Sequence, residues 1–200
     1  MSNQTFDRPP QPISIGTKDL AAPLSTAASI ARSVILISGW PLVVLLALAL
    51  SSLAFFSAPN FIGLFHDDGI YAVVAKALSE GNGYRIISLP GEPYQTKYPF
   101  LYSQLLSWAW SLNPQFPDNV SLLNFVNVFF YFASLLLAYV LYVQNTMGGK
   151  ADALLYVFLV GANAFVFSWT NYPLSDIPFM AAVMFSLTLS NSTNAFCTRT

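Results

Sequence analysis

Three carboxylates occupy positions where they could do chemistry beside a membrane. Asp67 and Asp68 directly follow a long apolar segment, and Asp176 opens another one. A carboxylate there could act as a general base toward a hydroxyl acceptor, although each acid is also typical of a helix N-cap. Both interpretations stay open. Because the chain has only 9 acidic residues, and ionisable groups near hydrocarbon are costly, three such acids favour a functional site.

Two cations lie between these acids in the sequence. Lys97, in Gln95-Thr-Lys-Tyr-Pro99, could hold a phosphate by charge-assisted hydrogen bonds; the alternative is a lysine that extends from the membrane interface into water. Arg85 is a second candidate for the same role. Tyr98 is typical of a membrane interface and, as the neighbour of Lys97, is counted among the expected substrate-binding residues.

Few other chemistries fit this composition. His66 is the single histidine and Cys197 the single cysteine, so a multi-histidine metal site and an internal disulfide are excluded. We expect no cofactor, although a mixed metal site of His66 with Asp67 or Asp68 stays an alternative. The 8 basic residues form no cluster, and nucleic acid is therefore not an expected partner.

The elements that must position these residues are membrane helices. Hydrophobic residues make up 55% of the chain and charged residues 8%, with a mean hydropathy of +0.56, whereas soluble domains carry about 25% charged residues. A soluble enzyme is thereby excluded. Four charge-poor segments approach or exceed the ~20 residues that cross a bilayer. We expect an all-α polytopic membrane protein. Residues 1–32 would form a disordered cytoplasmic tail and residues 59–120 an external catalytic loop. The four transmembrane helices are expected at residues 33–58, 121–144, 153–172 and 177–197.

The external loop has two segments with helical spacing. In residues 68–80 the apolar side chains fall on one face, between an acidic start and the stop signal Gly81-Asn-Gly83. In residues 99–112 a second apolar face forms. Both helices are expected to lie on the outer membrane surface. The expected faces are Ile70, Val73, Val74, Ala77 and Leu78 in the first helix, and Leu101, Leu105, Trp108 and Leu112 in the second.

Basic residues predict the orientation, because they concentrate on the cytoplasmic side. The tail, the 144–152 loop and the C-terminal end contain Arg8, Lys18, Arg32, Lys150 and Arg199; the other side contains Lys76, Arg85 and Lys97. The bias places the N-terminus in the cytoplasm and the long loop on the periplasmic, extracellular or lumenal side. We expect the membrane to be the plasma (inner) membrane.

The ordered motifs resemble a known family. A first apolar segment is followed by Asp67-Asp-Gly-Ile-Tyr71, then Ala77-Leu-Ser-Glu-Gly-Asn-Gly-Tyr84, Gly91-Glu-Pro93, Lys97-Tyr-Pro-Phe-Leu-Tyr102 and Ser175-Asp-Ile-Pro-Phe179. This order, over residues 34–190, resembles the polytopic membrane glycosyltransferases of the C-type fold, among them the aminoarabinose, lipopolysaccharide-core and protein mannosyl transferases of the cell envelope.

The resemblance implies a specific reaction. A sugar would pass from a polyprenyl-phosphate-linked donor to a lipid, glycan or protein acceptor. Asp67, or alternatively Asp68, would be the base, Asp176 would shape the site, and Lys97 would bind the donor phosphate. Between the two adjacent acids, we expect Asp67 to be the base and Asp68 to cap the helix that follows. Members of that family are longer, so the chain is expected to be an N-terminal fragment.

Two other classes of protein stay in view. A transporter would carry charges in the middle of broken helices, whereas here the charges lie outside the apolar segments. A non-catalytic membrane scaffold would not need acids grouped on one side. A transport assay would identify the first, and survival of function after Asp67→Asn would favour the second.

The charge bias predicts which positions are accessible from the same side of the membrane. Single cysteines at Ser88 and Lys150, introduced into a Cys197→Ser background, should react with a membrane-impermeant thiol reagent from opposite sides of the membrane. Labelling of intact and of opened cells measures this. Labelling of both positions from the same side would overturn the orientation.

Overall fold

The computed structural model describes residues 17–59, 61–146 and 148–197, and this part of the chain is all-helical. It has seven helices and no strand, with one isolated antiparallel bridge between Arg85 and Tyr94. The helices are α1 (Thr17–Ser57), α2 (Asp67–Ser79), α3 (Phe100–Leu112), α4 (Val120–Asn145), α5 (Lys150–Gly161), α6 (Ala164–Thr170) and α7 (Asp176–Cys197).

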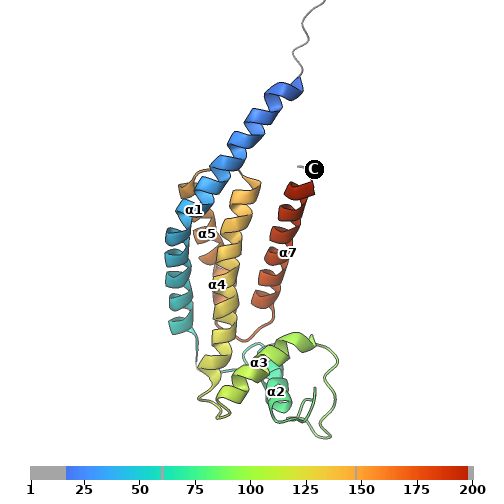
Figure 1. Cartoon of the computed structure of the whole chain (residues 1–200). Helices are drawn as coiled ribbons and strands as arrows, with labels where there is room; N and C mark the ends of the chain where they lie inside the picture. The colour runs from blue at the N-terminus through green and yellow to red at the C-terminus, as the bar shows by residue number, and fades with distance from the viewer. Residues whose placement is uncertain (1–16, 60, 147, 198–200) are drawn as a thin grey trace, which may run out of the picture.

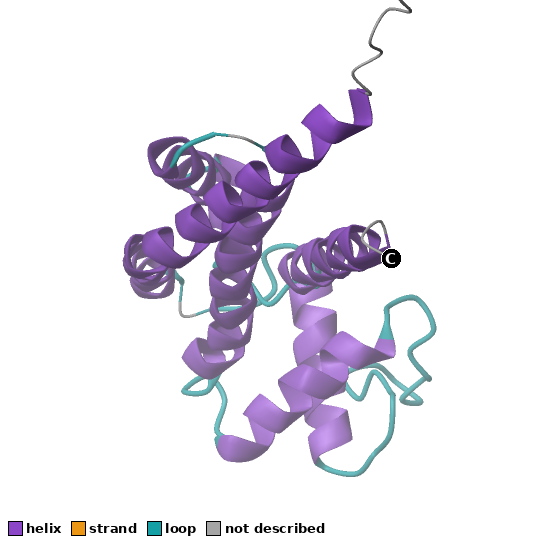
Figure 2. Cartoon of the chain, turned by 45° about the horizontal axis from the view of Figure 1, so that its top comes forward, coloured by secondary structure: helices purple, strands orange, loops and turns teal. Residues whose placement is uncertain are grey.

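Helix α4 is the centre of the bundle. It packs against α1, α5 and α7 along its length and against α3 near its first residue. Figure 1 shows the bundle with α2 and α3 together at one end, while the last residues of α7 lie at the opposite end. The view turned by 45° shows the first turns of α1 extending away from the other helices (Figure 2). The arrangement gives the molecule a bundle layer and a separate α2–α3 layer.

Two helices are long and apolar enough to cross a membrane, namely Ser33–Ser57 within α1 and Val120–Asn145. A bent pair, α5 and α6, would make a third if it counts as one span. Over the described residues, α7 is not among the helices that are both long and apolar enough to cross a membrane. The structure therefore supports a membrane protein with two candidate spans, and the expected count of four is not confirmed.

The expected third span, 153–172, is broken rather than continuous. Helices α5 and α6 meet at 59°. The side chain of Asn163 caps α6 by accepting hydrogen bonds from the backbone N–H groups of Phe165 and Val166, which favours a new helix start over continuation. On the other side of the break, the carbonyl of Gly161 accepts a hydrogen bond from Tyr131 at 2.8 Å. The bend thus follows from an N-cap residue inside an apolar segment.

The N-terminal segment also differs from the expectation. Helix α1 begins at Thr17, so residues 17–32 of the expected disordered tail are helical, and residues 1–16 lie outside the described part. This stretch is rich in alanine, the best helix former, and the apolar helix that follows it supplies the nucleus from which it extends.

Helices form in both segments of the external loop where the spacing predicted them. The buried face of the first overlaps the expected one only at Val74 and Ala77, because α2 packs on α3 and on Leu123 of α4. Its buried residues are Asp68, Tyr71, Ala72, Val74, Ala75 and Ala77. In α3 the expected stripe is on the outside: Leu101, Trp108 and Leu112 are 68%, 60% and 79% exposed. A stripe of large apolar side chains turned away from the protein suits contact with lipid.

Candidate functional site

Asp68 binds the backbone of the turn that leads into α2. Its carboxylate is fully buried and accepts four hydrogen bonds, from the N–H groups of Gly63 (2.8 Å), Leu64 (3.2 Å), Phe65 (3.2 Å) and Gly69 (2.9 Å). Three of these donors precede the helix. Asp68 therefore folds the preceding turn back on the helix start. Of the free N–H groups of α2 that it was expected to cap, it binds the one of Gly69.

Asp67, by contrast, points to the surface and meets the other chemically active groups. The side chain of Asp67 is 43% exposed. The hydroxyl of Tyr98 donates a hydrogen bond to Asp67 Oδ1, Lys97 Nζ lies 4.0 Å from the same oxygen, and His66 Nδ1 lies 3.5 Å from it. Adjacent helical residues point in different directions, which is why two neighbouring acids have such different surroundings.

Tyr98 links Lys97 to Asp67. The ammonium of Lys97 donates to the Tyr98 hydroxyl at 2.7 Å and lies 4.6 Å from the centre of the same ring. Since that hydroxyl also donates to Asp67, a cation, a phenol and a carboxylate form one continuous group. We call these three residues, Asp67, Lys97 and Tyr98, the loop triad.

The triad stabilises the charged forms of both its ends. The hydrogen bond from Tyr98 lowers the pKa of Asp67 most, and the hydrogen bond from His66 and the charge of Lys97 lower it further against the effect of burial. Conversely, the hydrogen bond with Tyr98 and the charge of Asp67 raise the pKa of Lys97. Asp67 is thus an ionised carboxylate, and Lys97 a cation, at neutral pH.

Asp176 lies at the first residue of α7 and reaches this region from another part of the chain. Next to it, Ser175 Oγ is 2.9 Å from the hydroxyl of Tyr71 on α2. Burial raises the pKa of Tyr71, and the charges of both Asp67 and Asp176 raise it as well. Both carboxylates are therefore near one phenol, although the chain separates them by more than one hundred residues.

Arg85 does not join this group. Its guanidinium donates to the hydroxyl of Tyr94 at 2.7 Å and to the carbonyl of Glu92 at 3.3 Å, and it stacks over the Tyr94 ring at 4.1 Å. These contacts hold the turn between residues 85 and 94 in place. The expected role of Arg85 in binding substrate stays a prediction.

A cavity lies next to the loop triad. It has a volume of about 430 Å³ and runs between α3, α4 and α7. Among the described residues, Asp176 is the only charged one that lines it, and Pro99, which lines it too, directly follows Tyr98. The other lining residues are Leu101, Tyr102, Leu105, Phe130, Ser175, Pro178, Phe179 and Ala182. The cavity is thus a mostly apolar space with a few polar side chains in its wall.

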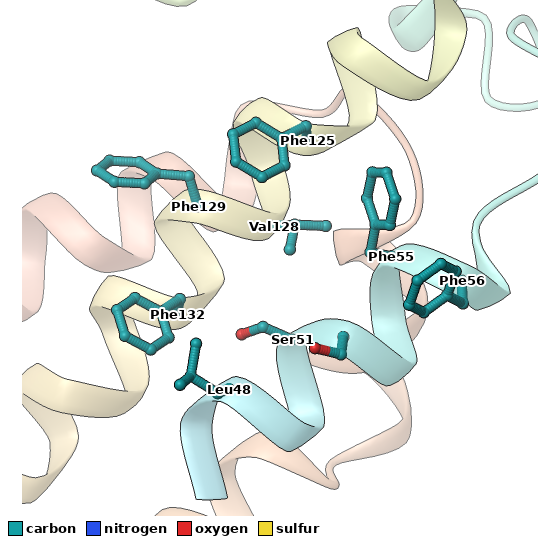
Figure 3. Close-up of a pocket in the computed structure, with 9 residues that line it drawn as sticks. Leu48, Ser51, Phe55, Phe56, Phe125, Val128, Phe129 and Phe132 are labelled. Atoms are coloured by element: carbon teal, nitrogen blue, oxygen red, sulfur yellow. The ribbon is translucent and has the colours of Figure 1, made fainter. Parts of the chain in front are cut away.

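A second cavity, of about 360 Å³, lies between α1 and α4 (Figure 3). Phenylalanines dominate its wall, and Ser51 and Ser52 are its polar residues. It has room for hydrocarbon but carries no charged or titratable side chain, so it offers no group for catalysis. Nor do the described residues contain any group of three or more His, Cys, Asp or Glu side chains that could hold a metal ion.

One residue that fixes this geometry was not singled out from the sequence. Asn127, on α4, is fully buried; its amide donates to the carbonyls of Tyr172 and Leu174, and its oxygen accepts from the Tyr102 hydroxyl at 2.7 Å. It thereby fixes the segment before α7 against both α3 and α4. The available signal was an asparagine inside an apolar helix, where unpaired polar groups are costly.

The contacts of the two adjacent acids predict that only one of them is needed for stability. Asp68→Asn should destabilise the protein, because an amide has one acceptor oxygen and would turn its own N–H₂ group toward two of the four N–H donors. Each unsatisfied buried donor costs about 1–3 kcal/mol. Asp67→Asn, at an exposed side chain, should have little effect. Thermal unfolding in detergent micelles measures both, and an Asp68→Asn protein as stable as the wild type would refute the structural role.

Comparisons with known proteins give no match for this chain. No family model fits it, no curated protein is detectably similar, and no solved structure matches. The resemblance to C-type glycosyltransferases therefore stays a prediction from the ordered motifs. The features of the structure that bear on function are the contacts of the loop triad, the position of Asp176, and the apolar cavity between α3, α4 and α7.

Proposed function

We propose that this chain is a glycosyltransferase, or the N-terminal part of one, of the outer face of a membrane. It transfers a sugar from a polyprenyl-phosphate-linked donor to a hydroxyl of a lipid, glycan or protein acceptor. One observation carries the proposal: a carboxylate and an ammonium share a tyrosine hydroxyl beside an apolar cavity. A lipid-linked phosphate needs a cation for its head and an apolar space for its chain, and both occur here.

The proposed reaction assigns a separate task to each end of the triad. Asp67 takes the proton of the acceptor hydroxyl while that oxygen forms a bond to the anomeric carbon of the sugar. The bond from this carbon to the phosphate oxygen breaks, and polyprenyl phosphate leaves with the bonding electrons. Lys97 stabilises the negative charge that develops on the leaving phosphate. The chemistry needs no metal or redox partner.

The position of the cavity suits the lipid part of the donor. Pro99 belongs to its wall and follows Lys97 by two residues, so a phosphate held by Lys97 would lie near the cavity rim. The chain would then extend past Leu105 and Phe179. Asp176 at the rim would face the sugar, where a carboxylate can accept hydrogen bonds from hydroxyl groups.

The contacts that Lys97 makes in the structure also leave its ammonium available to an anion. The side chain of Lys97 is 71% exposed, and its ammonium makes its short contact to the hydroxyl of Tyr98, not to a carboxylate. A phosphate could therefore reach it without breaking a close ion pair. Once Lys97 turned to the phosphate, one of the influences that lower the pKa of Asp67 would weaken, and the carboxylate would become a better base as the donor bound.

The phosphate-binding role predicts a selective loss on removing the ammonium. Lys97→Ala should raise the apparent KM for a polyprenyl-phosphate sugar by roughly ten- to a hundredfold, since a charge-assisted contact contributes about 1.5–3 kcal/mol. Release of polyprenyl phosphate by the whole chain in lipid vesicles measures this. The matched control is Lys76→Ala, which removes another lysine of the external loop, one whose ion pair is with Glu80 and not with a triad residue. An unchanged KM for the lipid donor would reduce Lys97 to an interfacial cation.

The general-base role predicts a loss of turnover rather than of donor affinity. Asp67→Asn keeps the size of the side chain and removes its basicity, so turnover should fall about 10²–10⁴-fold with the donor KM changed far less. Glu92→Gln, at an acid of the same loop outside the triad, serves as the control. If wild-type and Asp67→Asn proteins transfer sugar equally well, the reaction assigned to this site is wrong.

A further inference from the structure

We propose that Tyr71 is a positioning residue, which through its hydrogen bond to Ser175 holds the start of α7, and with it Asp176, beside the loop triad. The effect of Tyr71 on catalysis rests on the proposed function, but its structural role does not. The contact itself joins two segments that are 104 residues apart.

Tyr71 is placed by its helix to touch the triad. It follows Asp67 by four residues on α2, and such residues lie on the same face of a helix. Its ring lies 5.0 Å from that of Tyr98 and 4.8 Å from that of Tyr102, centre to centre. With 3% of its surface exposed, Tyr71 has little freedom to move. The phenol is thus held against the residue that donates to Asp67.

The other end of Tyr71 reaches α7. Within the described part of the chain, its bond to Ser175 is the one side-chain hydrogen bond between α2 and the segment that opens α7. Asn127 holds the backbone of the same segment, at residues 172 and 174, to α4 and through Tyr102 to α3, whereas the Tyr71 bond joins Ser175, the residue before Asp176, to α2. The Tyr71 contact therefore fixes the position of Asp176 relative to Asp67.

The charges around Tyr71 support this geometry. Burial and the two carboxylates, Asp67 and Asp176, keep the phenol protonated by raising its pKa. A protonated phenol and a serine hydroxyl can each donate or accept, so the contact survives over the whole physiological pH range. Neither hydroxyl takes part in the proton transfer, because Asp67 takes the proton of the hydroxyl that receives the sugar.

Hydrogen–deuterium exchange of the whole chain in lipid nanodiscs tests the contact without any assay of activity. Tyr71→Phe and Ser175→Ala should each speed exchange over residues 172–179 by about three- to tenfold, the effect of losing one neutral hydrogen bond. That segment includes the Phe179 N–H, which donates to the Ser175 carbonyl. The double variant should exchange no faster than Tyr71→Phe, and Ser175→Thr, which keeps a hydroxyl, should match the wild type. The control is Tyr156→Phe, an exposed tyrosine on α5.

Turnover provides the second measurement. Both single variants should lower it by about three- to tenfold with the KM for the polyprenyl-phosphate donor unchanged, and Ser175→Thr should restore it. Wild-type exchange over residues 172–179 in Tyr71→Phe would overturn the inference, and so would additive effects of the two substitutions. A wild-type chain that transfers no sugar, while the exchange data follow the expected pattern, would refute the proposed function and leave the positioning role of Tyr71 established.

Discussion

The arrangement of the candidate site depends on one buried amide. Asn127 lies inside α4, the helix against which most of the others pack, and its side chain satisfies two carbonyls before α7 and the hydroxyl of Tyr102 on α3. In apolar surroundings each of these groups would be costly to leave unpaired. Because only one position of the three segments satisfies all of them, the start of α7 is fixed against α3, and the cavity between the two helices has a defined shape.

Within that frame, two adjacent acids have separate functions. Asp68 uses both of its oxygens to hold the backbone that leads into α2, and this fixes the direction in which Asp67 leaves the helix. Asp67 in turn meets a phenol and an ammonium that come from the far end of the same loop. A rigid carboxylate that supports an exposed one is a common design for a site that needs a positioned base.

The sequence predicted the helices better than the contacts. Long apolar segments revealed the two candidate spans, and the stop signal at Gly81-Asn-Gly83 agreed with the end of α2 at Ser79. The break at Asn163 was missed, because its capping role outweighs the apolar pattern around it. Neither Asn127 nor Tyr71 was singled out, since their hydrogen-bond partners lie 25 to 104 residues away and no local pattern encodes such pairs. Asp67, Lys97 and Tyr98 were expected to serve one site, and their contacts show them together.

The most direct test of the central claim is to find where the lipid donor binds. A polyprenyl phosphate that carries a photoreactive group near its head, activated in vesicles that contain the whole chain, reports its position through the labelled peptides. We expect label in residues 97–105 and 175–182, which flank the cavity beside the loop triad. Label concentrated in the second cavity, between α1 and α4, would contradict the account. So would label that excess unlabelled polyprenyl phosphate does not reduce.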